Sequence, residues 1–233
     1  MRNVISLFLI FYIHIFTLSI VFSHPFNIEN VNINSSGIDN DINWEMVKLN
    51  IYKNHSNIAH FYVYKSTNPN FLPDYKYKSN FLTQTSGTEF TDTGDMLNPQ
   101  SSYYYVTAVS DSGVESLIPS DLACRIYMEL DFQEGKENLF WLSIPRGDTT
   151  QASDLLALAP EITTAVAWDA AAQSEIFYHS DGTGIDFSIE PGKAYGVKIS
   201  ADAVINLVGV ADRTERQLLK NIDNFSSHWI SVP

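Results

Sequence analysis

Short hydrophobic runs separated by polar turns fill the chain from residue 28 to about residue 128. The runs are rich in Tyr and Val, and none of them sustains the 3.6-residue spacing of an amphipathic helix. Runs of this kind between Asn, Ser, Gly and Pro residues predict β-strands. The turn clusters lie at residues 34–37, 66–69, 85–87, 92–95, 98–99 and 111–113. The pattern therefore predicts a β-sandwich of about seven strands.

Alternation is clearest in the last of these runs. Leu122, Cys124, Ile126 and Met128 point one way, and the residues between them, from Ala123 to Glu129, point the other way. This alternation predicts a half-buried strand with one face toward the core. Cys124 is then a small core residue rather than a reactive thiol.

Four segments together resemble successive strands of a fibronectin type III domain. They are Ile42-Asn43-Trp44, residues 60–66, residues 90–94 and the Tyr-rich run 103–109, and residues 111–116 are similar to the final hairpin of that family. The resemblance covers about 100 residues and implies a sandwich over residues 24–128. The Tyr-rich run is one residue short of the family spacing after Pro99, so either Tyr103 or Tyr104 takes the corner position.

Composition changes after the polar residues 133–138, where the chain becomes rich in Ala. A Trp-containing strand at 140–145 precedes a short helix at 151–159, which has Asp154 near its start and Pro160 after its end. Further strands are predicted at 164–169, 175–179, 194–200 and 204–210, with turns at 181–184 and 190–193. This second unit, residues 129–210, resembles a small β-rich module that recurs after immunoglobulin-like domains in bacterial secreted and surface proteins.

The end of the chain repeats an earlier segment. His228-Trp229-Ile230-Ser231-Val232-Pro233 restates residues 140–145 after 88 residues, and each copy follows a polar lead-in. Such a repeat indicates that a unit has been copied. We therefore expect residues 211–233 to begin a second, truncated copy within a longer protein; the alternative is that this strand completes the sheet of the first copy.

The first 23 residues predict export. After Arg2, no charged residue occurs from Val4 to Phe22, and Ser23 precedes His24-Pro25. This pattern is typical of a signal peptide cleaved after Ser23, whereas an uncleaved anchor would favour a basic stop-transfer cluster, which does not follow. We expect a secreted or cell-surface protein with no membrane insertion after cleavage, and the single cysteine without a disulfide suits a bacterial source.

Charge limits the partners of the mature chain. Cleavage removes one basic residue and no acid, which leaves 13 basic and 27 acidic side chains, a net charge of 13 − 27 = −14. Such a surface repels nucleic acid, so we expect none as a partner. A protein or polysaccharide partner remains open.

Two tripeptides have the letters of known functional motifs. Asp92-Thr93-Gly94 matches an aspartic-protease motif, but a single copy lies where the sandwich family places a turn. Arg146-Gly147-Asp148 matches an integrin-binding tripeptide, but it directly follows Pro145 rather than lying in a protruding hairpin. We interpret the first as a turn and the second as a chance match.

Two features of the sequence raise metal-binding hypotheses. A free amino group on His24 would resemble the copper chelate of polysaccharide oxygenases, but the histidines at 55, 60, 179 and 228 show no ligand spacing. Residues 181–186 lack the alternating ligands and closing Glu of a calcium loop. We expect no metal, no cofactor and no catalytic residue.

The four tryptophans, Trp44, Trp141, Trp168 and Trp229, all lie in strand patterns and favour the core. An exposed Trp168 or Tyr195 would be able to stack on a sugar ring. The sequence therefore favours a non-catalytic spacer or binding segment, with unknown ligand residues. The alternative is a carbohydrate-binding accessory segment of a secreted polysaccharide-degrading enzyme, which predicts aromatic side chains on one exposed face.

Overall fold

The computed structural model describes residues 28, 30–45, 58–116 and 119–211. The chain is mainly β, with antiparallel sheets and one short α-helix in the described residues, so the predicted fold class is confirmed. The predicted signal peptide at 1–23 lies outside the described residues. The predicted second copy at 211–233 also lies outside them, apart from residue 211. No helix within those residues is both long and apolar enough to cross a membrane.

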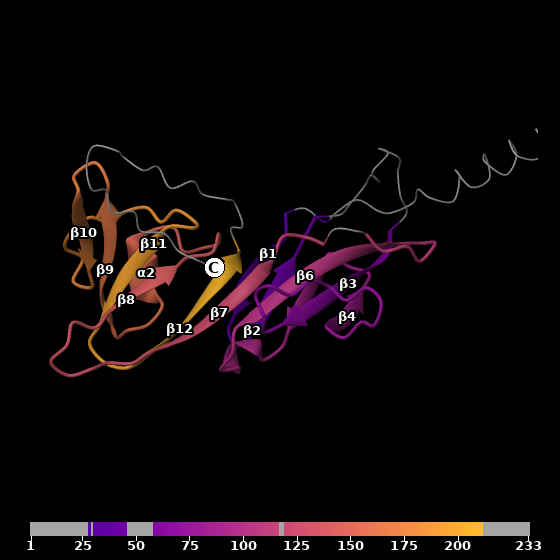
Figure 1. Ribbon diagram of the computed structural model, residues 1–233, viewed down its shortest axis with the longest axis horizontal. Helices are drawn as coiled ribbons and strands as arrows, with labels where there is room; N and C mark the ends of the chain where they lie inside the picture. Colours follow the sequence, from indigo (N-terminus) through magenta and orange to yellow (C-terminus); the bar gives the residue numbers. More distant parts are fainter. Residues whose placement is uncertain (1–27, 29, 46–57, 117–118, 212–233) are drawn as a thin grey trace, which may run out of the picture.

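The first unit is a sandwich of two sheets (Figure 1). One sheet has the order β1-β2-β5, and the other has the order β12-β7-β6-β3-β4. The strands are β1 (Asn32–Ser36), β2 (Asp39–Asn43), β3 (Ile58–Ser66), β4 (Phe81–Thr85), β5 (Glu89–Asp92), β6 (Ser102–Ser110), β7 (Ala123–Leu130) and β12 (Ala203–Val210), and the 3-10 helix η1 (Asp95–Leu97) follows β5. Strands β1 to β7 supply the predicted number, and this strand order is that of a fibronectin type III-like sandwich with β12 added at one edge.

Alternate residues of these strands meet between the two sheets. Ile33 and Ile42 from one sheet pack against Phe61, Val63 and Val106 from the other, and all of them are buried. Trp44, just after β2, is buried with its ring edge against Phe61 at 5.4 Å between centroids. The core thus follows from the period-two pattern of the sequence.

The second unit is a four-stranded antiparallel sheet of order β10-β9-β11-β8, with a helix on one face (Figure 1). Its elements are β8 (Leu139–Ser143), α2 (Ala152–Ala157), β9 (Ile162–Asp169), β10 (Ser174–His179) and β11 (Ala194–Ile199). Gln151 and Asp154 form a capping box at the start of α2. The buried Leu155 of α2 then packs into a core with Leu142, Ala165 and Val197.

Strands β7 and β12 form a ribbon that both units share. They pair along their whole length, from Ala203 opposite Leu130 to Val210 opposite Ala123. One half of the ribbon belongs to the second core, through Leu130, Ile205 and Leu207, whereas Ala123 belongs to the core of the sandwich. The boundary at residue 128 stays a prediction, and the structure adds that residues 131–202 lie between two paired strands.

The predicted alternation of side chains is present in β7, but the prediction that one face of this strand is exposed is wrong at Arg125. Leu122 faces outward from the sandwich, and Ala123 and Arg125 face the space between the sheets. A half-buried strand would leave Arg125 in solvent, yet Arg125 is 0% exposed. The reason is that β12 covers the strand and supplies Asn206, while the η1 region supplies an acidic partner, so the charge is paired and hydrogen-bonded.

Candidate binding surface

The loop between β3 and β4 is anchored by one aromatic side chain. Phe71 is buried against Tyr105 of β6, with 5.1 Å between ring centroids. Both rings belong to a small cluster on the outer face of the five-stranded sheet, together with Tyr64 and Leu122. The loop therefore packs on the sheet instead of projecting freely into solvent.

Two polar side chains fix the turn that follows this anchor. The Asp74 carboxylate accepts hydrogen bonds from the amide of Tyr77 at 2.9 Å and from the hydroxyl of Ser79 at 2.7 Å. These bonds lower the pKa of Asp74. Asn80 accepts a bond from the amide of Asp74 and donates one to the carbonyl of Leu72, each at 2.9 Å. The turn is thus closed on itself from both sides.

Lys78 joins this turn to the sheet. Its ammonium donates hydrogen bonds to the hydroxyl of Tyr64 and to the carboxylate of Glu115, and it lies 4.3 Å from the centroid of the Tyr62 ring. Lys78 also adopts a left-handed backbone with φ of 56°. A non-glycine residue there is strained and persists only where its surroundings hold it. The ion pair and the ring contact are what hold it here.

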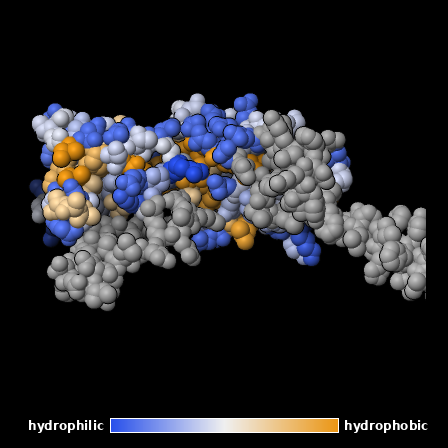
Figure 2. Space-filling model, turned by 90° about the horizontal axis from the view of Figure 1, so that it is seen from above, coloured by the Kyte–Doolittle hydropathy of each residue, from blue (hydrophilic) through white to orange (hydrophobic). Residues whose placement is uncertain are grey.

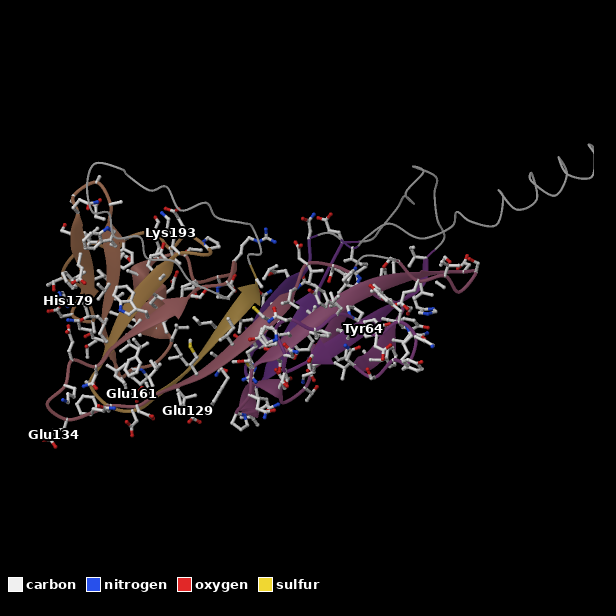
Figure 3. The ribbon with its side chains drawn as sticks, in the orientation of Figure 1. Tyr64, Glu129, Glu134, Glu161, His179 and Lys193 are labelled. Carbon is white, nitrogen blue, oxygen red and sulfur yellow. The ribbon has the colours of Figure 1, made fainter. Side chains whose placement is uncertain are left out.

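Tyr64 lies beneath Lys78 and is fully buried. Its hydroxyl donates a hydrogen bond to Glu115 Oε1 at 2.6 Å. Burial, followed by this bond and the negative charge of Glu115, raises the pKa of Tyr64. Burial and the charge of Glu115 also raise the pKa of Tyr75 to about 12. Both phenols are therefore neutral at physiological pH. Figure 3 shows Tyr64 in the middle of the sandwich sheet.

Exposed hydrophobic side chains concentrate above this fixed base. In the described part of the chain, ten large hydrophobic side chains are exposed, and five of them come from residues 72–82. These five are Leu72, Tyr75, Tyr77, Phe81 and Leu82. Tyr77 is the most exposed, at 74%, and Lys76 lies 4.6 Å from its ring centroid. We call Leu72, Tyr75, Lys76, Tyr77, Lys78, Phe81 and Leu82 the Tyr–Lys surface.

The five exposed hydrophobic residues of this surface lie close together along the chain. Seen from above, hydrophilic residues cover much of the molecule, and hydrophobic residues form small patches among them (Figure 2). Contiguous apolar patches rimmed by polar groups mark binding sites more often than isolated exposed residues do. The predicted strands and turns do not reveal this surface, and the sequence signal that points to it is the alternating Tyr75-Lys76-Tyr77-Lys78.

The Asp92-Thr93-Gly94 segment belongs to a different, structural site. Gly94, with φ of 78°, makes the turn into η1. Asp92 accepts a bond from the Tyr104 hydroxyl at 2.7 Å and pairs with Lys65 at 2.6 Å. Tyr104 is therefore the tyrosine that lies between the sheets, whereas Tyr103 packs on the outer face. Asp92 is thus held by a lysine and a tyrosine and has a structural role in this turn.

Asp95 completes this inner polar network, which also contains Lys65, Asp92, Tyr104 and Arg125. Asp95 accepts hydrogen bonds from Arg125 at 3.0 Å and from Lys65 at 2.7 Å. The other donors to Asp95 are Asn40 at 2.6 Å and Ser102 at 2.8 Å. Burial alone would raise the pKa of Asp95, but the bonds from Lys65 and Ser102 and the charges of Lys65 and Arg125 lower it. The network ties both sheets together, because Asn40 lies in β2 of one sheet and Arg125 lies in β7 of the other.

The Arg146-Gly147-Asp148 segment lies against β12. Arg146 and Val210 exchange backbone hydrogen bonds at 2.9 and 2.8 Å. A Cβ on Gly147 would lie 2.5 Å from the carbonyl oxygen of Val208, so the backbones approach too closely for any other residue. This glycine serves packing between the second unit and the ribbon, and the tripeptide is not on a protruding loop.

The calcium and copper hypotheses gain no ligand set. Asp181 accepts bonds from Thr183 within its own turn, and Asp186 accepts a bond from the amide of Ser153 at the start of α2. His24, on which the copper hypothesis depends, lies outside the described residues, as do His55 and His228. His60 lies in β3 of the sandwich, and His179 lies in β10 of the second unit (Figure 3 labels His179). No group of three or more His, Cys, Asp or Glu side chains suited to a metal occurs among residues that the structure describes.

The candidate sugar-stacking residues of the second unit differ from each other. Tyr195 is buried, its ring is stacked on Phe187, and its hydroxyl accepts a bond from the amide of Glu190 at 2.7 Å. It is therefore a core residue and not a platform. Trp168 is partly exposed on β9, on the face opposite α2.

Cys124 is predicted to be inert toward thiol reagents. It is 0% exposed, and burial raises its pKa to about 12. Only the thiolate reacts, so a thiol-specific chromogenic disulfide at pH 8 should label no cysteine in the native chain and one per chain in concentrated guanidinium chloride. Rapid labelling of the native protein would contradict the burial of this residue.

No protein-family model matches the chain, and no curated protein matches it. One solved structure that it resembles is a Fn3-like protein from Clostridium thermocellum, with 26% sequence identity over 44% of this chain and 92% of that one. The TM-score of 0.32 is low, so the fold assignment rests on the strand order and registers given above.

Proposed function

We propose that the chain is a non-catalytic extracellular segment of a larger secreted or cell-surface protein, which spaces neighbouring domains and binds a partner through the Tyr–Lys surface. One observation carries the proposal: half of the exposed large hydrophobic side chains in the described residues lie within one short segment that is held rigid from below. Fixed aromatic side chains bind at low entropic cost.

The shared ribbon supports the spacing role. A unit joined by a flexible linker rotates freely, whereas here two paired strands contribute side chains to both cores. The leader at residues 1–23 and the acidic mature chain support export and argue against nucleic acid as partner. The partner is therefore a protein or a polysaccharide.

Exposed tyrosines favour one narrower alternative, carbohydrate binding. Tyr77 presents a largely exposed ring, and neighbouring Lys76 supplies a hydrogen-bond donor. Aromatic rings with polar neighbours are what sugar rings stack on in the accessory segments of secreted polysaccharide-degrading enzymes. This alternative uses the same surface and differs only in the partner.

Binding by the mature chain, residues 24–233, tests the proposal. We would measure retention on neutral and uronate-containing polysaccharides and select binders from a phage-displayed peptide library. The double variant Leu72→Ser/Tyr77→Ser should lose at least tenfold in affinity, because removing each of the two exposed anchors costs about 1–2 kcal/mol.

The matched control removes exposed hydrophobic residues elsewhere, with Ile38→Ser/Ile185→Ser, which lie at 50% and 60% exposure. This control should bind like the natural chain. Equal binding by both double variants, absence of any binder, or turnover of a polysaccharide by the chain would each overturn the proposal.

A further inference from the structure

One face of the sheet β10-β9-β11-β8 packs on α2, and the other face carries a different set of side chains. Leu142, Ala165 and Val197 belong to the core that contains Leu155 of α2. Because successive side chains of a strand alternate between faces, their neighbours along the chain point the other way. We call this side of the sheet the outer face. Its side chains are Glu175, Phe177 and His179 of β10, Thr164, Val166 and Trp168 of β9, Ala194, Gly196 and Lys198 of β11, and Leu139, Trp141 and Ser143 of β8.

The strand registers arrange the outer face in rows that cross the sheet. The middle row, which we call the apolar strip, runs from β10 to β8 through Phe177, Val166, Gly196 and Trp141. The row on one side of the strip contains His179, Thr164, Lys198 and Leu139. On the other side, Glu175 lies opposite Trp168, and Ala194 lies opposite Ser143. The strip therefore crosses all four strands between polar side chains.

Gly196 lets the side chains around the strip lie low on the sheet. A Cβ at this position would be 2.9 Å from Cδ1 of Leu139 and 3.3 Å from Cη2 of Trp141. Both side chains therefore extend from β8 across β11 instead of standing upright. Trp141, Trp168 and Phe177 are each partly exposed. The outer face is thus a flat surface with accessible aromatic rings.

Polar groups beside the strip are held in place. His179 Nδ1 hydrogen-bonds with the hydroxyl of Thr164 at 3.0 Å, and no bond from Nε2 occurs in the described part of the chain (Figure 3 labels His179). Lys198 pairs with Glu137 at 2.7 Å, and its ammonium lies 5.8 Å from the centroid of the Phe177 ring. Across the strip, Glu175 is exposed. A ligand on the strip therefore meets an imidazole and an ammonium along one edge and a carboxylate along the other.

The other outward sheet faces in the described residues differ from this one. The sheet β1-β2-β5 turns polar side chains outward, among them Asn34, Asp41 and Thr91, which lie opposite one another. The outer side of the five-stranded sheet is packed in part by Phe71 of the β3–β4 loop and forms the base of the Tyr–Lys surface. A flat aromatic strip with polar groups on both sides is therefore specific to the second unit.

An extended neutral polysaccharide matches this pattern. A sugar ring with equatorial linkages has two apolar C–H faces and carries its hydroxyls around the edge, so it stacks on aromatic rings and hydrogen-bonds sideways. An apolar protein segment would instead bury Lys198, His179 and Glu175 without partners, which is costly. The net charge of −13 and the exposed Glu175 oppose polyuronates and nucleic acid.

We infer that the outer face binds a neutral polysaccharide of β-1,4-linked sugars, which lies along the apolar strip with Trp168 beside it. The strip crosses three strand spacings, about 14 Å, which is long enough for more than one sugar ring. This site lies in the second unit, whereas the Tyr–Lys surface lies in the sandwich. The chain then has two separate binding surfaces, and it gains avidity where both are occupied.

Calorimetric titration of the mature chain, residues 24–233, with cellohexaose tests this site, because this sugar is a soluble β-1,4-linked glucose chain. Trp168→Ala should weaken binding about tenfold or more by removing a stacking ring, whereas Trp168→Phe keeps a ring and should stay within about threefold of the natural chain. Glu175→Ala changes an exposed residue and should weaken binding about threefold without affecting the fold. Maltohexaose, whose α-1,4 linkages coil the chain, should bind about tenfold more weakly or not at all.

The matched control is Leu72→Ser/Tyr77→Ser, which changes the other surface and should leave cellohexaose binding unchanged. No binding of cellohexaose at about 10 mM, equal binding by Trp168→Ala, or equal binding of maltohexaose would each overturn the inference. If cellohexaose binding depends on Tyr77 and not on Trp168, the inference fails and the proposed function stands. Repeating the test of the Tyr–Lys surface in the Trp168→Ala chain measures that surface alone, so the two proposals fail separately.

Discussion

Replacing Asp95 by Asn should reduce the free energy of unfolding by about 3–5 kcal/mol, because it leaves buried cations without their partner. Arg125 is fully buried and Asp95 is 4% exposed, and the charge on Asp95 also faces Lys65. The amide keeps the shape of the carboxylate, so the loss is electrostatic. Denaturant unfolding followed by tryptophan fluorescence would measure it.

An exposed ion pair gives the matched control. Glu190 pairs with Lys193 at 2.8 Å, but the side chains are 61% and 49% exposed. Glu190→Gln should change the free energy of unfolding by less than about 1 kcal/mol. Similar losses for the two variants would show that the inner polar network is not buried as described.

The carboxylate of Asp95 should also make the free energy of unfolding depend on pH in the acidic range. The pKa of Asp95 is lowered in the folded chain, so its contribution is complete above the unfolded pKa of about 4 and is lost as pH falls below that value. The difference in stability between the natural chain and Asp95→Asn should therefore shrink as pH falls below about 4. A difference that stays constant into acid would contradict the lowered pKa.

Several strands of both units could be predicted because they have a local signal. The alternation at 122–129 and the hydrophobic run at 175–179 before the turn at 181–184 depend only on neighbouring residues, and they place β7 and β10 within a residue or two. The helix predicted at 151–159 begins where its capping box places it, but it ends earlier, at Ala157. Local sequence signals are therefore sufficient to predict these strands and this helix.

Contacts between distant segments could not be predicted in this way. The strand pattern predicts that Arg125 faces solvent. Its partners, Asp95 and Asn206, lie 30 and 81 residues away along the chain, so the local sequence does not indicate them. Likewise, Lys78 and Glu115 meet only because β3 and β6 are neighbours in the sheet. The Tyr–Lys surface is therefore a product of topology, and a run of Tyr and Lys alone does not reveal its rigid base.

Separating the two units at the predicted boundary should lower the free energy of unfolding of both parts. A chain of residues 24–128 lacks β12, so Arg125 loses its bond to Asn206 and the edge of β7 is uncovered. A chain of residues 129–211 lacks Ile126 and Met128, which pack against the second core, and leaves β12 without its partner strand. We expect residues 24–211 to unfold in one transition and each fragment to be at least about 3 kcal/mol less stable or unfolded.

A shortened chain, in which a turn joins β7 directly to β12, distinguishes the loss of β12 from the loss of residues 131–202. Because Ala203 lies opposite Leu130, an Asn-Gly turn between them would keep β7 and β12 paired while removing residues 131–202. This chain should unfold at a higher denaturant concentration than residues 24–128, since it keeps Asn206 beside Arg125. If residues 24–128 were equally stable, the ribbon would not be a structural part of the sandwich, and the two units would be joined only by a linker.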